Sequence, residues 1–440
     1  MKTKIVFFIA VITSFTAFSQ KQWTLKECVD YALANNITVK QNKLNVQLAK
    51  KDVEIAKGNF LPDLNGSANS SVNFGSSIGQ SGTRISADNF RSSFNLSSNT
   101  TLFNGFRNLN TYKQSQLGVE RSKLDLEVIE NDISLQVINS YLNVLFAKEN
   151  LAVAEVQAEI SKKQIERAQA QFDAGAIPKG DLLNVQSTAA TDAQNVVTQL
   201  NNLNLSLLTL SQLLQVSSDS FDVEKIEVDS PSVALLYDNA SVVYNKALTN
   251  RPEIERAQLS IENSDLNIEI SKGAYLPTLS FGASAGSSYQ NFFNEVFTND
   301  YFFSQIKDNM GYSLGLSLNV PLFNRFQTKN RVAKSIINKE QSKLDLENEK
   351  LRLQQTIEQA FLDAKAAAKA FEAAQISLNA QQEAFKNAQT SYDYGAMTQF
   401  DFDQVRNRLV NAEAALISAK YDYVFKTKVL KFYFGESIVD

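Results

Sequence analysis

The sequence contains the same pattern twice, and this duplication limits the folds open to the chain. SKLDLE begins at residues 122 and 342, and LFNGF at residue 102 returns as LFNRF at residue 322, so both pairs lie 220 positions apart. FDAGAIPKGDLLNVQ (172–186) and YDYGAMTQFDFDQVR (392–406) keep that offset. FLPDL at residue 60 returns as YLPTL at residue 275, an offset of 215, which places five additional residues early in the second copy. The pattern predicts a tandem structural repeat with copies at 20–216 and 241–435.

Each copy is predicted to begin with a helix and to pass from it into extended chain. The helical segments are LKECVDYALANNITVKQNKLNVQLAKKDVEIAKG in the first copy and YNKALTNRPEIERAQLSIENSDLNIEISKG in the second. The glycine near the end of each segment is followed shortly by a proline, Pro62 or Pro277. Proline fixes φ and lacks the backbone donor, so we expect each helix to end there.

Beyond each proline the hydrophobic period changes from helical to two, which predicts strands. We expect four strands, at about 63–75, 90–103, 277–288 and 310–322. One side of each strand is apolar, whereas the other side carries Asn, Ser, Thr and Gly. The connecting segments 76–89 and 287–309 are polar or aromatic and show no helical period, so we expect loops.

These strands fit a membrane better than a soluble core. Runs of about 10 residues suffice for a tilted strand to cross a bilayer, and aromatic residues gather near the strand ends as interfacial girdles do. Two amphipathic hairpins packed on a soluble core are the alternative. If the strands cross a membrane, the residues expected to face lipid are Phe94, Leu96, Phe281, Leu314, Leu316 and Leu318.

Four strands cannot close a barrel within one chain. The smallest membrane barrels use about eight strands, and an open edge is not tolerated in hydrocarbon. Two chains would supply about eight strands around a filled interior, whereas three would supply about 12 around a water-filled lumen. The small polar face of the strands fits a lumen better.

Composition argues for export and against catalysis. Residues 1–19 place Lys2 and Lys4 before an apolar run and end in a small-residue cleavage pattern, which predicts a signal peptide. The chain has no His and a single cysteine, Cys28, so we expect no enzyme, no cofactor and no metal site. Removing Lys2 and Lys4 from the 43 basic residues leaves 41 against 47 acidic residues, a balance that argues against a nucleic-acid partner.

Long helices are predicted after the strands of each copy. Residues 119–174 contain neither Gly nor Pro and would form a helix of about 84 Å, and residues 322–394 would form one of about 110 Å. Apolar residues follow a heptad, in one row of Leu124, Ile138 and Leu145 and another of Val128, Leu135 and Leu142. We expect helical hairpins from helices at about 106–174 with 181–216, and 325–394 with 400–434.

The repeated phrase is then the tip of each hairpin, about 100 Å from the strands if the helices run straight. Gly175 and Gly395 fall where the end of a helix needs a residue with positive φ. Asp181 and Asp401 fall where the start of the return helix can use an N-cap acceptor.

The order of helix, x-[FY]-L-P, two strands, L-F-N, long hairpin and glycine-containing tip, present twice, resembles the TolC-like outer-membrane efflux family over essentially the whole mature chain. The opening WTLKECVDYALANN is similar to the usual start of that family. The resemblance implies a mainly α fold with a β-barrel part. It implies a trimer whose 12-stranded outer-membrane β-barrel continues as a 12-helix periplasmic α-barrel. Residues 217–240 would be an equatorial linker and 436–440 a tail.

The resemblance also implies a function. The protein would be the passive exit duct of a tripartite efflux or type I secretion system in the outer membrane of a Gram-negative bacterium. Its partners would be two further copies of itself, outer-membrane lipid, a periplasmic adaptor and, indirectly, an inner-membrane pump. A periplasmic structural coiled coil with no transport role is the alternative. Drugs, metal ions, siderophores and secreted polypeptides all stay open as substrates.

Residues at the hairpin tips match positions with roles in the family. Small residues at the tips let an adaptor approach closely, and the matching positions are Ala174, Gly175, Ala176, Tyr394, Gly395 and Ala396. Helix capping alone is the alternative role for the two glycines.

A second group of tip residues matches the family's periplasmic aperture. Asp401 matches the aperture acid, Asp181 is its counterpart in the first copy, and Tyr392 matches a latch tyrosine. The sequence departs from the family at Met397, where a linking Arg is often found, and at Gln404, which replaces a second acid. A simple N-cap is the alternative role for Asp401.

Overall fold

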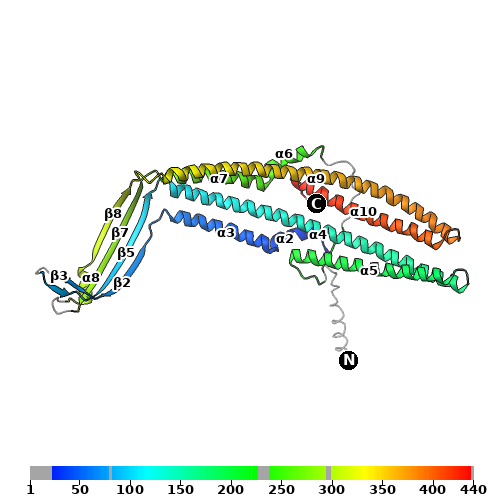
Figure 1. Ribbon diagram of the computed structural model, residues 1–440, viewed down its shortest axis with the longest axis horizontal. Helices are drawn as coiled ribbons and strands as arrows, with labels where there is room; N and C mark the ends of the chain where they lie inside the picture. Colours follow the sequence, from blue (N-terminus) through cyan, green and yellow to red (C-terminus); the bar gives the residue numbers. More distant parts are fainter. Residues whose placement is uncertain (1–21, 79–81, 220, 226–236, 294–298, 438–440) are drawn as a thin grey trace, which may run out of the picture. The chain divides into compact units, whose positions relative to one another are not determined.

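A computed structural model of the protein describes residues 22–78, 82–219, 221–225, 237–293 and 299–437 (Figure 1). The expected signal peptide lies outside the described residues. Residues 226–236 of the expected linker and 438–440 of the tail also lie outside them.

The chain forms two compact units, and each unit takes segments from both copies of the repeat. The first unit lies within Met1–Lys43, Asp125–Ile254 and Asn348–Asp440, and the second consists of Leu44–Leu124 and Glu255–Glu347. The second unit contains the strands of the expected barrel, and the first contains both hairpin tips.

The sheet of the second unit is a four-stranded antiparallel meander (Figure 1). Its order is β2 (Asn65–Asn73), β5 (Asn89–Phe103), β7 (Thr278–Phe292) and β8 (Gly311–Asn319). The pairing of β5 with β7 joins the two copies at the centre of the sheet. The outer strands have nine residues each and the central strands 15.

The segments between paired strands contain regular structure that the sequence analysis did not predict. β3 (Ser76–Ile78) and β4 (Arg84–Ser86) form a small hairpin. The segment 287–309 was expected to be a loop, and this was wrong, because β7 continues to Phe292 and Phe302–Asp308 form a helix, α8. Seven residues are too few to show a helical period.

Side-chain amides cover the edge of β7 where β8 is absent. Gln305 accepts from the backbone N–H of Gln290 and donates to its carbonyl oxygen, both at 2.9 Å. Asn299 makes the same pair of bonds with Phe292, both at 2.8 Å. These amides satisfy backbone groups that would otherwise leave an open strand edge.

The first helix of each copy is interrupted, so the expectation of a continuous helix was wrong. α2 (Leu25–Asn35) and α3 (Ile37–Gly58) are separated at Asn36, whose side-chain oxygen accepts from the N–H of Thr38 at 2.9 Å. α6 (Ala240–Asn250) and α7 (Pro252–Gly273) are separated at Arg251, because the ring of a proline disfavours helical backbone in the residue before it.

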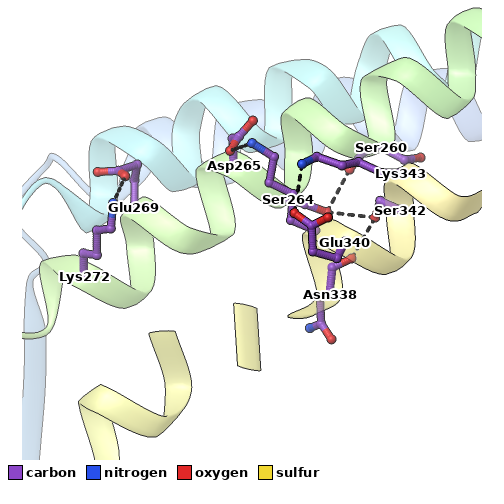
Figure 2. Close-up of polar contacts among 10 residues, drawn as sticks. Ser260, Ser264, Asp265, Glu269, Lys272, Asn338, Glu340, Ser342 and Lys343 are labelled. Atoms are coloured by element: carbon purple, nitrogen blue, oxygen red, sulfur yellow. Dashed lines mark hydrogen bonds and ion pairs between the residues drawn. The ribbon is translucent and has the colours of Figure 1, made fainter. Parts of the chain in front are cut away.

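In the second unit, α7 contacts α9 (Gln327–Asp393) through paired serines, and Figure 2 shows one of the pairs, Ser264 with Ser342. The hydroxyl oxygens of Ser264 and Ser342 lie 3.0 Å apart, and those of Ser271 and Ser335 lie 2.9 Å apart. The pairs are one heptad apart on both helices, so small side chains keep one antiparallel seam close. Lys339 adds an ion pair of 2.6 Å to Asp265.

The core of the first unit is built on α4 (Arg107–Asp173). Ile138 and Leu145 of the predicted heptad are fully buried beside Tyr141. The Tyr141 hydroxyl lies 2.7 Å from the carbonyl oxygen of Glu224. This contact secures the short parallel pair of β1 (Gln22–Trp23) and β6 (Asp222–Val223).

Two helical hairpins make up most of the first unit. α4 is followed by the return helix α5 (Lys179–Leu214), and α9 by α10 (Gln399–Phe434) (Figure 1). None of the helices in the described part of the chain has an apolar stretch long enough to span a bilayer.

Candidate functional site

The strand register gathers the six residues expected to face lipid on one face of the sheet. Directly paired residues of an antiparallel sheet point to the same side. Leu96 pairs with Ala285, Phe281 with Leu316, and Ala283 with Leu314, which links this face across β5, β7 and β8. All six side chains are exposed, from 36% at Phe281 to 78% at Leu314. We call the face with Phe94, Leu96, Phe281, Leu314, Leu316 and Leu318 the apolar face.

The opposite face, which we call the polar face, carries small uncharged side chains over most of its area. Asn95 pairs with Ser67 and with Gly286, and Ser284 pairs with Ser313. The Ser284 and Ser313 hydroxyl oxygens lie 2.7 Å apart. The sheet therefore separates an exposed hydrocarbon surface from a wettable one across a single layer.

Part of the apolar face lies beneath α8. The Phe302 ring packs edge-on to Phe94 with centroids 6.3 Å apart, and it also meets Tyr289 at 5.0 Å. Phe94 is thus the one expected lipid-facing residue with an aromatic neighbour from α8. Tyr301 and Phe303 beside it are 90% and 82% exposed, so α8 extends the aromatic surface at that end of the sheet.

The repeated L-F-N motif forms the turn from the sheet into each long helix. Asn104 caps α4 by accepting from the N–H of Asn108 at 3.2 Å, and Asn324 bonds Thr328 at the start of α9. Left-handed residues follow each Asn: Gly105 and Phe106 with φ of 69° and 61°, and Arg325 and Phe326 with 54° and 60°. The motif therefore encodes a sharp turn between strand and helix.

The two hairpin tips have the same backbone geometry. Gly175 and Gly395 have φ of 73° and 72°, as predicted for residues that end a helix. The next N–H groups, of Ala176 and Ala396, bond carbonyl oxygens five residues back, both at 2.8 Å. This is a Schellman turn. The six residues expected at the adaptor contact are all exposed: Ala174, Gly175, Ala176, Tyr394, Gly395 and Ala396.

Neither expected N-cap aspartate caps its helix, so that expectation was wrong. α10 begins after Thr398, whose hydroxyl accepts from the N–H of Asp401 at 3.1 Å and donates to its carboxylate at 2.7 Å. α5 begins after Pro178, which has no capping side chain, and Asp181 lies in the first turn. Both return helices start earlier than predicted, and both carboxylates occupy the favourable positive end of the helix dipole.

Tyr392 lies at the centre of a contact between the two hairpins of one chain. Its ring stacks on Phe402 with centroids 4.7 Å apart, and the Arg167 guanidinium lies 5.0 Å from the ring centre. Arg167 of α4 also pairs with the carboxylate of Asp393 at the end of α9. This hydrogen bond lowers the pKa of Asp393, and burial raises the pKa of Tyr392.

Arg406 is a buried charge of this region that sequence reasoning missed. It is 3% exposed and lies on α10. Its guanidinium donates to Ser161 of α4 at 2.7 Å and lies 3.3 Å from the carboxylate of Asp192 on α5. Ser161 also bonds Asp192. Three helices from both copies are therefore joined through one cation, and no local signal in the sequence marks it.

A cavity of about 810 Å³ lies between the two tips. Of the expected aperture and docking residues, it is lined by Asp181, Tyr392, Ala176 and Gly395. Asp401 lies outside its lining, as do the other four docking residues. Within the described residues, no group of three or more His, Cys, Asp or Glu side chains is placed to hold a metal ion.

Comparison with known proteins fits this architecture. The family model for outer membrane efflux proteins matches residues 28–215 and 243–436. The chain is 22% identical to outer membrane protein TolC of Escherichia coli (strain K12) over 432 residues, 96% of this chain and 83% of that one. It is 21% identical to outer membrane efflux protein BepC of Brucella suis biovar 1 (strain 1330) over 420 residues, 96% and 86% of the two chains. The CmeC outer membrane channel of Campylobacter jejuni superposes with a TM-score of 0.76 at 21% identity, over 93% of this chain and 85% of that one.

These matches confirm the resemblance to TolC-like proteins. The protein lies in the outer membrane of a Gram-negative bacterium, with its helical part in the periplasm. Its function is that of an efflux exit duct. The alternative of a structural coiled coil without transport is not favoured. The chain belongs to the outer membrane efflux protein family.

Proposed function

We propose that three copies of this chain close one barrel in the outer membrane and form a passive exit duct for tripartite efflux or type I secretion. The observation that supports this proposal is the four-stranded sheet, which has one exposed apolar face and one face of small polar side chains. Three such sheets supply 12 strands, and their polar faces line a water-filled bore. The driving energy comes from an inner-membrane pump.

The edges of the sheet support closure between copies. β2 and β8 are the outer strands, both nine residues long, and each has one unpaired edge. They run antiparallel, so β8 of one copy can pair with β2 of the next and continue the meander. Unpaired backbone groups cost several kcal/mol each in hydrocarbon, so only closure makes the strands stable in a bilayer.

The tips carry the proposed contact with a periplasmic adaptor. Ala174, Gly175, Ala176, Tyr394, Gly395 and Ala396 form the contact in this proposal. They are exposed and mostly small, and the cavity between the tips adds a concave surface beside them. A partner helix of the adaptor would approach the backbone closely at the two glycines.

The periplasmic aperture of the duct is proposed to lie at the same tips. Asp401 and Asp181 supply negative charge around it, and Tyr392 holds the two hairpins of one chain together. Met397 cannot supply the ion pair that an arginine would make at that position. The Arg167 pair with Asp393 joins α4 to α9 in its place.

The membrane arrangement is tested by arginine substitutions on adjacent residues of β8. Leu316 lies on the apolar face and Ser317 on the polar face. An arginine facing lipid near the bilayer midplane costs about 2–4 kcal/mol, whereas one facing the bore stays hydrated. We expect L316R to lose outer-membrane trimers in membrane fractions and S317R to keep them and to open pores in planar bilayers. Equal loss, or a wild type that stays soluble and monomeric without detergent, would refute the proposal.

Docking is tested at the tips without altering a glycine. Ala176→Arg and Ala396→Arg place bulk and charge at exposed positions, and Ala190→Arg does the same on α5 away from the tip. We expect the two tip variants to lose co-purification with the adaptor after cross-linking, and the Ala190 variant to retain it. Retention by all three variants would remove the tips from the interface.

A further inference from the structure

Arg91 is the only charged residue in the four described strands of the sheet, β2, β5, β7 and β8. All the others are apolar, aromatic, glycine or uncharged polar residues. A charge is costly on the lipid side of a barrel strand and tolerated on the water side. The face on which Arg91 lies therefore decides what its charge can do.

The register places Arg91 on the polar face. It pairs with Ser71 of β2 and with Gln290 of β7, in the same alternation that places Asn95 beside Ser67 and Gly286. The adjacent residue Phe90 belongs to the opposite side. Arg91 is exposed, so its guanidinium is open to solvent on this face.

Among the described residues of the sheet, the direct neighbours of Arg91 on the polar face are uncharged. Its flanking residues along the strand on the same face are Asn89 and Ser93, and across the sheet it meets Ser71 and Gln290. The nearest carboxyl group along the chain is Asp88, which precedes the strand. One Asp88 oxygen accepts from the N–H of Gly75 at 2.6 Å in the turn that leads to β5.

We propose that Arg91 forms an anion-binding ring at the end of the bore, beyond the last pairing of β8, which biases the barrel toward anionic solutes. This rests on the proposed duct of three copies, since closure brings three guanidinium groups to one level of the lumen. Arginine stays charged at any physiological pH and presents a fork of donors suited to carboxylate and phosphate groups. The ligand class is accordingly small or extended anions that carry such groups.

The strength of this bias depends on salt. A ring of like charges in a bore with low-dielectric walls raises the local concentration of counter-ions. The Debye length is about 10 Å at 0.1 M salt and about 3 Å at 1 M, so mobile ions screen the ring at high salt. A side chain with only a structural role would not produce selectivity that fades in this way.

The test measures the chloride-to-potassium permeability ratio of single channels from reversal potentials in a KCl gradient. We expect Arg91→Gln to lower the ratio at least about twofold at 0.1 M salt, with a smaller change at 1 M. Arg91→Lys keeps the charge and should stay close to wild type. An unchanged ratio in the glutamine variant at low salt, with pores of normal conductance, overturns the proposal.

A matched control separates the ring from general surface charge. Lys307 lies on α8, whose Phe302 packs against the apolar face. Lys307→Gln removes one positive charge per chain and should leave the chloride-to-potassium permeability ratio unchanged. If it shifts the ratio as much as Arg91→Gln does, the effect does not come from a ring in the bore. If the wild type opens no pore at all, the duct itself is refuted, and the ring with it.

Chemical modification after assembly makes the test independent of whether Arg91→Gln assembles normally. Arg91→Cys channels can be assembled first and then treated with a cationic or an anionic thiol-reactive methanethiosulfonate. The native thiol of Cys28 is fully buried, which protects it from the reagent. We expect the cationic adduct to restore the wild-type ratio and the anionic adduct to lower it further. Identical ratios after both reagents overturn the proposal.

Discussion

Gly273 and Gly58 occupy equivalent places in the two copies, but the structure predicts different responses to the same mutation. Each glycine ends the helix that leads into the strands, α7 in one copy and α3 in the other. A Cβ at Gly273 would collide with the backbone oxygen of Gly105 and lie 2.7 Å from the Cγ of Arg107. A Cβ at Gly58 would meet nothing within 4 Å.

The expected change in the free energy of unfolding follows from the atoms around each glycine. The backbone of Gly105 cannot rotate aside as a side chain would, so Gly273→Ala must shift the start of α4 or the end of α7. Overpacking of this kind costs about 1–3 kcal/mol. Gly58→Ala adds a methyl group in open space and restricts the unfolded chain, so its effect lies between neutral and a gain of about 1 kcal/mol.

The assay is urea unfolding of the detergent-purified protein, followed by circular dichroism, for wild type and both variants side by side. We expect the free energy of unfolding to fall for Gly273→Ala and to stay level or rise slightly for Gly58→Ala. Equal losses in the two variants would show that the close approach of Gly273 to Gly105 is not what limits this position. A loss confined to Gly58→Ala would contradict the reasoning outright.

Three further predictions concern the turns and the tips. Arg325 has φ of 54°, which costs a non-glycine residue about 1–2 kcal/mol, so Arg325→Gly should raise the urea midpoint. Arg167 lowers the pKa of Asp393, so the ion pair between them is complete above the ordinary aspartate pKa and weakens as pH falls through the lowered value. Single-channel recording should therefore show wider opening at that low pH, and Arg167→Gln should show the same wide opening already at pH 7. Burial raises the pKa of Glu413, and a hydrogen bond from Gln157 opposes this shift less strongly, so the charged carboxylate opposes folding at neutral pH. Glu413→Gln should therefore raise thermal stability slightly at pH 7. This advantage should disappear as pH falls through the raised pKa of Glu413.

Features with a strong local signal were predictable from the sequence. The alternation in LGLSL and its equivalents gave the faces of the strands, because a period of two admits only one division into sides. The paired glycines at the tips were predictable because positive φ at the end of a helix strongly favours glycine. Their φ angles of 73° and 72° in the structure agree with this expectation.

Other features depend on tertiary contacts or on competing local signals. Arg406 meets Ser161 across 245 positions of sequence, and nothing near either residue indicates the pairing. Asp401 looked like an N-cap because aspartate is a good one, but Thr398 three residues earlier takes that place and Asp401 completes the turn. Pro252 marks the break at Arg251, although the apolar pattern continues on both sides of it.

The central claim is that the apolar face of the sheet lies against lipid while the polar face meets water inside a shared barrel. It is tested most directly by spin labels at two adjacent residues of β5, Leu96→Cys on the apolar face and Asn95→Cys on the polar face, in protein reconstituted into bilayers. We predict that collisions with oxygen, which concentrates in hydrocarbon, dominate at position 96 and that collisions with a water-soluble nickel complex dominate at position 95. The account would be contradicted if the nickel complex reached both positions, or if neither oxygen nor the nickel complex reached position 96.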